Sequence, residues 1–326
     1  MESIYALSDI VIGIFSIPGL NLYWGNFIVG LFLAGGVYYY LSYTQTFPSN
    51  KSLLSYIFPR KVLFHRSSIT DYGFLVPIKL FMVFCYPTLM EPLLNIAYWL
   101  GELIAGFERS LVFIQLRGLI GTTEINESIG WSIGFSIYMM VIVDFALFFA
   151  HYLMHKSKFL WEFHKVHHSA QVLNPITVAR MHPVDYLVNG TIILACSTVG
   201  VGLWLLFIPF TFEELTILGS SMFIFLFYLL GGILRHSHVW LSYGKKIEHF
   251  LISPAQHQVH HSAMPKHYNK NMGMKLAIWD HLFGTLYTTT SRPEVFRMGL
   301  YAKEDREYNS ILKCLYLPLL KLIRKK

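Results

Sequence analysis

Three short segments place histidines at the spacing of successive helical turns. "HYLMH" holds His151 and His155, "HKVHH" spans 164–168, and "HQVHH" spans 257–261. Side chains at i, i+3 and i+4 lie on one face of a helix, so each segment can direct its imidazoles toward one metal ion. The repeated spacing therefore predicts a metal site built from helices that are far apart in the sequence.

A fourth pair, His236 and His238 in "LRHSHVW", follows a long apolar stretch. One histidine at the edge of a membrane is most often only an amphipathic anchor. So many imidazoles together would carry a high desolvation cost unless something bound them, and they exceed the four ligands of one zinc ion. We therefore expect a dinuclear centre held mainly by nitrogen. The candidate metal ligands are His151, His155, His164, His167, His168, His236, His238, His257, His260 and His261.

Asp144 lies seven residues before His151, on the same helix face and inside an apolar run. An ionisable group in such a run is costly and by default indicates function. We expect its carboxylate to accept an imidazole N–H and so to fix the tautomer of a metal ligand. The alternative is a hydrogen bond between two helices.

The three cysteines, Cys85, Cys196 and Cys314, are far apart and stand in apolar surroundings. They form no CxxC pair, so neither a disulfide framework nor a cysteine-ligated zinc site is expected. Any metal must therefore be held by nitrogen and oxygen.

The composition is that of an integral membrane protein. Of the 326 residues, 54% are hydrophobic and only 14% are charged, and the mean hydropathy is +0.46. The formal net charge of +7 then favours anionic lipid and membrane topology over nucleic-acid binding.

Apolar runs long enough to cross about 30 Å of hydrocarbon predict four or five membrane spans. Prolines in the second run predict kinks or a break there. The carboxyl-terminal segment "ILKCLYLPLLKLIRKK" alternates apolar with basic residues and fits a helix lying in the membrane interface. The predicted spans are 24–43, 74–100, 130–153 and, around a turn at 209–214, two within 187–234.

Basic residues orient these spans, because loops rich in Lys and Arg tend to remain cytoplasmic. Segment 44–72 is basic, whereas the residues before the first span include acidic side chains but no Lys or Arg. This places the amino terminus outside and the histidine segments on the cytoplasmic side. We therefore predict an all-α fold with one membrane-embedded domain over 1–326, in which 154–186 and 235–310 form a polar, histidine-rich cap on an integral membrane helical bundle.

Two blocks of the sequence resemble the core of the fatty acid hydroxylase and sterol desaturase superfamily of membrane di-iron enzymes. The first block, Asp144 to Asp185, holds the HxxxH segment and the first HxxHH segment. The second block, His236 to Tyr287, holds the other HxxHH segment and ends with a "WDxLFGT" signature. The resemblance covers 144–290, which is the expected catalytic core, and is nearest to the branch that contains alkylglycerol monooxygenase.

The resemblance implies two iron ions held by the histidines, with O2 as co-substrate. It implies oxidation of a C–H bond in a membrane lipid or in a fatty acyl or alkyl chain. Hydroxylation is the expected reaction, and desaturation or sterol oxidation on the same scaffold is the alternative. Asn174 and Arg180 match polar positions of the first block and, with Asp144, are the candidate catalytic residues.

A histidine-rich metal transporter is the alternative from another class of protein. A transporter would spread ionisable residues along a path through several spans. Here they cluster at one predicted side of the membrane, which favours the enzyme.

The resemblance also implies an external electron donor. The sequence has no GxGxxG dinucleotide motif and no cysteine cluster for iron–sulfur, and its "HPVD" at 182–185 differs from the HPGG of a fused cytochrome b5. We expect a separate reductase or cytochrome to dock on the cytoplasmic face. The expected location is the bacterial inner membrane or the endoplasmic reticulum.

Overall fold

Four helices of the computed structural model are long and apolar enough to cross a membrane. They confirm four of the predicted spans, and few of their residues are buried inside the protein, as expected for helices that face lipid. The structure describes residues 22–44, 52–108, 129–207, 216–217 and 220–324. The four spans are Trp24–Tyr43, Arg66–Gly101, Gly130–Lys156 and Pro183–Leu205.

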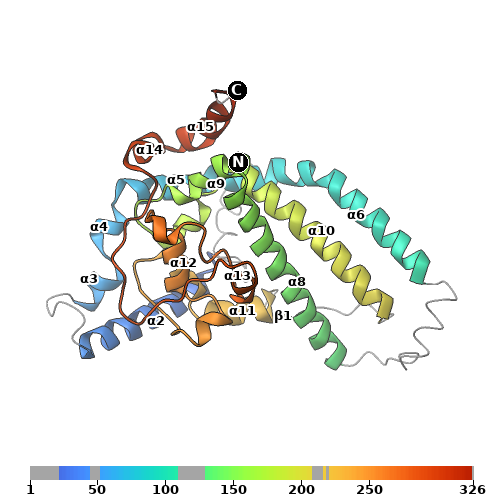
Figure 1. Ribbon diagram of the computed structural model, residues 1–326, viewed down its shortest axis with the longest axis horizontal. Helices are drawn as coiled ribbons and strands as arrows, with labels where there is room; N and C mark the ends of the chain where they lie inside the picture. The colour runs from blue at the N-terminus through green and yellow to red at the C-terminus, as the bar shows by residue number, and fades with distance from the viewer. Residues whose placement is uncertain (1–21, 45–51, 109–128, 208–215, 218–219, 325–326) are drawn as a thin grey trace, which may run out of the picture.

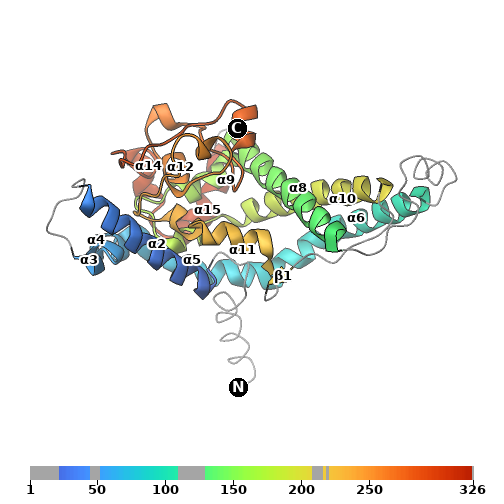
Figure 2. The ribbon, with the colours of Figure 1, turned by 90° about the horizontal axis from the view of Figure 1, so that it is seen from below.

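Three long helices, at residues 86–108, 129–156 and 183–207, extend to one side of the molecule, whereas the other two, at 24–43 and 66–80, lie on the other side with the shorter helices and loops that form a cap (Figure 1, Figure 2). The histidine segments belong to this cap and to the helix end that enters it. The long helices are α2 (Trp24–Tyr43), α5 (Arg66–Leu80), α6 (Tyr86–Glu108), α8 (Ile129–Lys156) and α10 (Pro183–Phe207).

Helix α10 packs against both α6 and α8. Two glycines allow this close approach, since a Cβ on Gly190 would lie 2.0 Å from the Tyr86 hydroxyl and one on Gly200 would lie 3.1 Å from Ile142. The Tyr138 hydroxyl donates to the carbonyl of Gly200 at 2.9 Å. Small residues at such contacts are typical of helices that associate in membranes.

The second span is one continuous helix with an irregular hydrogen-bond pattern near its prolines, so the predicted break is not present. A π-helical segment, η1 (Phe81–Cys85), joins α5 to α6. Pro77 lies inside α5, and Pro92 lies inside α6. Proline has no N–H to donate and its ring crowds the preceding turn, so the helical hydrogen-bond pattern changes between these positions.

The predicted fifth span is wrong for the described residues. The helix that precedes His236 is α11 (Met222–Leu229), which has 8 residues. Its length of about 12 Å, at about 1.5 Å per residue, cannot cross about 30 Å of hydrocarbon. Gly231 ends it in the left-handed region, with φ of 94°.

A two-stranded antiparallel ribbon, β1 (Thr216–Ile217) with β2 (Ser220–Ser221), precedes α11. The predicted turn at 209–214 lies outside the described residues.

The cap consists of short helices joined by ordered loops. The predicted segments 154–186 and 235–310 form the cap, together with residues 53–63. Its elements are α3 (Leu53–Ile57), α4 (Arg60–Leu63), α9 (Lys158–His168), η2 (Pro175–Ala179), η3 (Gly232–His236), η4 (Ile247–His249), α12 (Pro254–His260), η5 (Pro265–His267), α13 (Ile278–Leu282) and α14 (Ala302–Glu307).

Buried carboxylates hold the cap loops in place. Asp280, in the "WDHLFGT" segment, accepts hydrogen bonds from the backbone of Met272 and Gly273 at 2.7 Å each and from Thr285. Glu248 accepts from the hydroxyls of Ser253 and Thr289 and from other donors. Irregular segments lack the regular hydrogen bonds of helices and strands, yet their buried polar groups must be hydrogen-bonded. The two carboxylates supply acceptors for these groups.

The carboxyl-terminal helix α15 (Ile311–Arg324) is amphipathic, as predicted. Cys314 and Pro318 are buried where α15 packs against α9 and α5, while Leu312 and Ile323 are mostly exposed. An exposed apolar row beside basic residues suits the membrane interface, so the expected interfacial position remains a prediction.

Candidate metal centre

Nine of the ten candidate ligands come together in two adjacent groups. Within each group the nearest ligand atoms all lie within 4.8 Å of one another, and nearly all the side chains are buried. Rings of the two groups are in contact, for example His168 and His261 with centroids 4.6 Å apart. The first group is His151, His155, His164, His168 and His260; the second is His167, His236, His257 and His261.

The two HxxHH segments contribute to both groups in a crossed manner. Helix α9 gives its i, i+4 pair, His164 and His168, to the first group and His167 to the second. Helix α12 and the residue after it give the pair His257 and His261 to the second group and His260 to the first. The side chains at i+3 and i+4 leave the helix in somewhat different directions. One short helix can therefore supply ligands to two neighbouring sites.

Both short helices begin at capping serines. Ser157 accepts from the backbone N–H of Leu160 at the start of α9. Ser253 accepts from Gln256, whose side chain accepts in return from the backbone of Ser253, and Pro254 occupies the first helical position of α12. These caps satisfy the free N–H groups of helices too short to be stable alone.

His236 belongs to the second group, but the prediction that His238 is a metal ligand is wrong. Helix η3 ends at His236, and Ser237 is extended, with φ of −150° and ψ of 173°. His238 is exposed, and its Nε2 bonds to the carbonyl of Tyr56 at 2.6 Å. The change from helical to extended backbone gives the two rings different directions, so only one enters the centre.

The Nδ1 atoms of four ligands contact acceptors, which fixes the tautomer. His151 donates to the carbonyl of Met272 at 2.8 Å, His167 to that of Arg180 at 3.2 Å and His260 to that of Lys270 at 2.8 Å. The Nδ1 atom of His164 contacts the carboxylate of Asp185 at 3.3 Å. With the proton on Nδ1, each Nε2 presents a bare lone pair to its group, as a metal ligand must.

Four Nε2 atoms of the first group have no hydrogen-bond partner in the described protein. The Nε2 atoms of His155, His164, His168 and His260 are buried without a hydrogen bond. In the second group, the His236 Nε2 lies 3.0 to 3.2 Å from the Nε2 atoms of three other ligands. Neutral imidazoles cannot all donate and accept in such a cluster, so the residues fit two bound cations.

The imidazoles outside the spans are held in the neutral form that binds metal. Burial is the largest cause, and it lowers the pKa of His236 and His260 to about 3. Neighbouring histidines and, for His236, the Arg235 guanidinium act in the same direction. Burial lowers the pKa well below its ordinary value for His167, His168, His257 and His261 as well.

The region that carries this geometry, residues 136–285, matches the model of the fatty acid hydroxylase family. This region is a fatty acid hydroxylase domain.

Curated relatives share the domain at low identity. Ornithine lipid hydroxylase OlsE of Rhizobium tropici is 31% identical over 180 residues, which are 53% of this chain and 48% of that protein. Very-long-chain aldehyde decarbonylase GL1-9 of Oryza sativa subsp. indica is 31% identical over 147 residues, 45% of this chain and 52% of that protein. Alkylglycerol monooxygenase of Homo sapiens is 28% identical over 144 residues, 44% of this chain and 28% of that protein.

The chain therefore spans about half the length, or less, of the curated relatives it matches. No solved structure matches it significantly.

Asp144 is buried in the hydroxylase domain, but its predicted role is wrong. Its carboxylate accepts from the backbone N–H groups of Lys275 and Leu276, at 3.0 Å each, and from the Trp279 indole at 3.1 Å. It therefore ties α8 to the loop before the "WDHLFGT" signature. That loop includes Met272, whose carbonyl orients His151, so Asp144 acts on the metal centre only through the backbone.

Asn174 and Arg180 are also structural rather than catalytic in position. Asn174 caps η2 and donates to Asp71 of α5 at 2.9 Å. The Arg180 guanidinium is fully buried and pairs with the same Asp71 at 3.1 Å. Neither side chain lines the cavities beside the histidines. Arg180 contributes to the site by its carbonyl, which accepts from His167.

Two residues of the site were missed from the sequence. Asp185 orients His164, whereas the nearby His182 bonds to the carbonyl of Leu315 at 3.0 Å. Arg235 donates to the Nδ1 of His257 at 2.9 Å. An ionisable residue next to a histidine of the centre was the available signal for Arg235.

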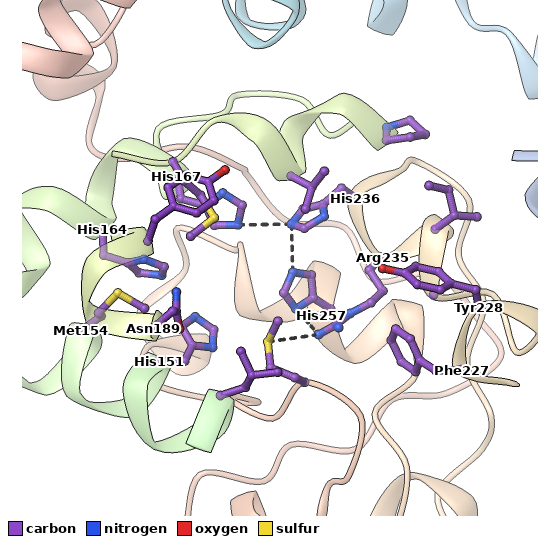
Figure 3. Close-up of a pocket in the computed structure, with 18 residues that line it drawn as sticks. His151, Met154, His164, His167, Asn189, Phe227, Tyr228, Arg235, His236 and His257 are labelled. Atoms are coloured by element: carbon purple, nitrogen blue, oxygen red, sulfur yellow. Dashed lines mark hydrogen bonds between the residues drawn. The ribbon is translucent and has the colours of Figure 1, made fainter. Parts of the chain in front are cut away.

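Two cavities adjoin the histidines from different directions. The first, of about 280 Å³, is lined by five histidines from both groups and by apolar side chains that include Leu147, Met154 and Phe227 (Figure 3). The second, also about 280 Å³, is lined by His155, His168 and His260 with tyrosines and Glu304. The first can hold an apolar reactant, whereas the second is the more polar approach to the same centre.

Proposed function

We propose that the protein is a di-iron oxygenase that uses O2 and external electrons to hydroxylate a C–H bond of a membrane lipid. The observation that carries the proposal is the convergence of nine imidazoles, eight of them buried, in two adjacent groups, of which five imidazoles line the wall of an apolar cavity. Imidazole ligands suit iron, and membership of the hydroxylase family supports this choice. Bound iron would supply the oxidising power that side chains lack.

The protein's own contribution is positioning. The Nδ1 contacts to Met272, Arg180, Lys270 and Asp185 hold the ligands in one tautomer and orientation. Apolar residues from α8, the start of α10 and α11 line the first cavity and exclude water from it. An acyl or alkyl chain in this cavity would lie against both histidine groups, which supports oxidation of an unactivated carbon.

Electrons would come from a separate reductase or cytochrome on the side of the second cavity. Trp161 lies in this cavity, with its ring 5.1 Å from that of His155 and 5.4 Å from that of His168. We infer that this face is cytoplasmic, as the distribution of Lys and Arg favours, in the bacterial inner membrane or the endoplasmic reticulum.

The test is lipid analysis of cells that express the wild-type protein or His168→Ala. A lipid that gains one oxygen atom only with the wild type, together with two iron ions per purified chain, supports the proposal. Loss of two hydrogen atoms instead would make the protein a desaturase. A protein that carries zinc or copper without iron, and changes no lipid, would refute the proposal and favour metal transport or sensing.

A further inference from the structure

Arg235 is a buried cation in the wall of the first cavity. It is the penultimate residue of η3, directly before His236, and only 5% of its surface is exposed. Its side chain reaches the cavity between His257 and the aromatic rings of Phe227 and Tyr228 (Figure 3). The guanidinium carbon lies 5.4 Å from the centre of the Phe227 ring.

The hydrogen bonds of this guanidinium are incomplete. One nitrogen, Nη2, donates to the carbonyl of Gly273 at 3.2 Å and lies 2.9 Å from the Nδ1 of His257, a contact that is a hydrogen bond only while this Nδ1 carries no proton. The Nε atom is buried and has no hydrogen-bond partner in the described part of the chain. No carboxylate of the described residues forms an ion pair with Arg235. A buried cation without a counter-charge is among the costliest arrangements in a protein.

The neighbouring charges are of both signs: Lys275 is a second cation, and the carboxylates of Asp144 and Asp280 act on Arg235 without forming an ion pair with it. Lys275 places its ammonium 5.8 Å from the centre of the same Phe227 ring. Asp144, a nearby carboxylate, is already occupied by two backbone N–H groups and an indole. An arginine guanidinium stays charged at neutral pH. The cavity therefore offers positive charge to whatever enters it.

We propose that Arg235 binds an oxyanion of the lipid substrate, either a carboxylate or a phosphate. The inference rests on the proposed function, because it names the substrate class of that same cavity. The guanidinium fork suits both anions, and its free donor would complete the pairing.

The site also determines which carbon is oxidised. Because Arg235 contacts His257, which belongs to the second histidine group, the anionic end of the lipid would lie beside the metal centre. The cavity volume of about 280 Å³ is near the lower end of ligand sites, which run from roughly 300 to 1,000 Å³. It has room for the polar end of a lipid and its first carbons. The oxidised carbon would therefore be near the anionic group and not at the far end of the chain.

The experiment compares three probes of equal chain length, palmitic acid, hexadecyl phosphate and hexadecanol. Their binding is measured with the full-length, metal-loaded protein in nanodiscs of neutral lipid. The variants are Arg235→Gln, which removes the charge, Arg235→Lys, which keeps it, and Arg292→Gln, which removes the same charge from an exposed position. Metal content is measured for each variant, because Arg235 also contacts His257.

We expect the wild type and Arg292→Gln to bind at least one anionic probe roughly 10- to 100-fold more tightly than the alcohol, as a charge-assisted hydrogen bond allows. Arg235→Gln should lose this preference, and Arg235→Lys should keep part of it. The ratio of acid to phosphate identifies the anion. If Arg235→Gln loses metal, Arg235→Lys decides: a retained preference supports the site, and its loss overturns it.

The inference is overturned if the wild type shows no preference, or if metal-loaded Arg235→Gln keeps it. These results are independent of turnover. A protein that binds anionic lipid through Arg235 but oxidises nothing would refute the proposed function alone. A protein that oxidises lipid with the same preference in Arg235→Gln would refute this inference alone. When product forms, fragmentation in the mass spectrometer should place the new oxygen near the anionic end.

Discussion

Arg180 and Arg235 are both buried beside the histidines, yet their surroundings differ completely. The guanidinium of Arg180, 1% exposed, pairs with Asp71 and donates to Ser169 and to the carbonyls of Val166 and Tyr308, among others. That of Arg235, 5% exposed, has no carboxylate partner among the described residues and an unused Nε. A buried guanidinium whose hydrogen bonds and ion pair are all made within the protein has a structural role. One that keeps an unused donor and faces a cavity is suited to bind a ligand.

The largest expected effect comes from the histidines that lie between these two arginines. His168→Ala and His261→Ala each remove one ligand, one from each group. We expect metal affinity to fall by more than roughly 100-fold, because loss of an outer partner alone costs roughly 10- to 100-fold. Lipid product should disappear, while membrane insertion is retained. Metal analysis of the purified protein and lipid mass spectrometry measure this, and full lipid oxidation by His168→Ala would show that the ligand assignment is wrong.

The next effect tests the two arginines directly. Arg180→Gln leaves Asp71 buried without its counter-charge and should reduce the free energy of unfolding by about 3–5 kcal/mol. Arg235→Gln removes a cation that lacks such a partner, so its cost should be under about 1 kcal/mol or of opposite sign. Denaturant unfolding in one detergent compares the variants. Equal losses would remove the distinction between the two sites.

A smaller effect is expected at Asp185, which orients His164 from outside the first group. Asp185→Asn keeps the shape but replaces the anionic acceptor with an amide, and should weaken metal binding by roughly 10- to 100-fold. Metal titration of the stripped protein measures the affinity. An affinity equal to that of the wild type would show that the contact with His164 does not hold the ligand.

The smallest effect is expected at His238, which lies only two residues after His236 but outside both groups. His238→Ala should leave metal content and product unchanged. It should cost at most about 1.5 kcal/mol of stability, because it loses one hydrogen bond to Tyr56. This variant is the matched control for His168→Ala. Loss of metal in His238→Ala would show that His238 is a metal ligand.

The helical periodicity was enough to predict eight of the nine histidines that come together, because i, i+3 and i+4 positions on one helix share a face wherever the helix lies. It failed at His238, where the backbone becomes extended after one more residue. Helical periodicity also did not predict the hydrogen-bond donors to the Asp144 carboxylate, which come from residues 275–279. Local spacing cannot predict which distant loop will cover a helix face.

The spans were predictable from composition alone, except after α10. There an apolar stretch was divided into two spans, whereas α11 is short and ends at Gly231. Hydropathy measures how apolar a segment is but does not show where its helix ends. Arg235 was missed for a related reason: its importance depends on an unused Nε and on the absence of an ion pair with any described carboxylate, which only the three-dimensional arrangement reveals.

The crossed contribution of the two HxxHH segments has a consequence for assembly. Each bound cation would join α8 or η3 to both α9 and α12, so the pair would cross-link distant parts of the chain much as disulfides do. Removing either ion would release ligands from both short helices at once. Uptake of the two ions should therefore be cooperative and should be coupled to completion of the cap, since ligand binding stabilises the fold that presents the site.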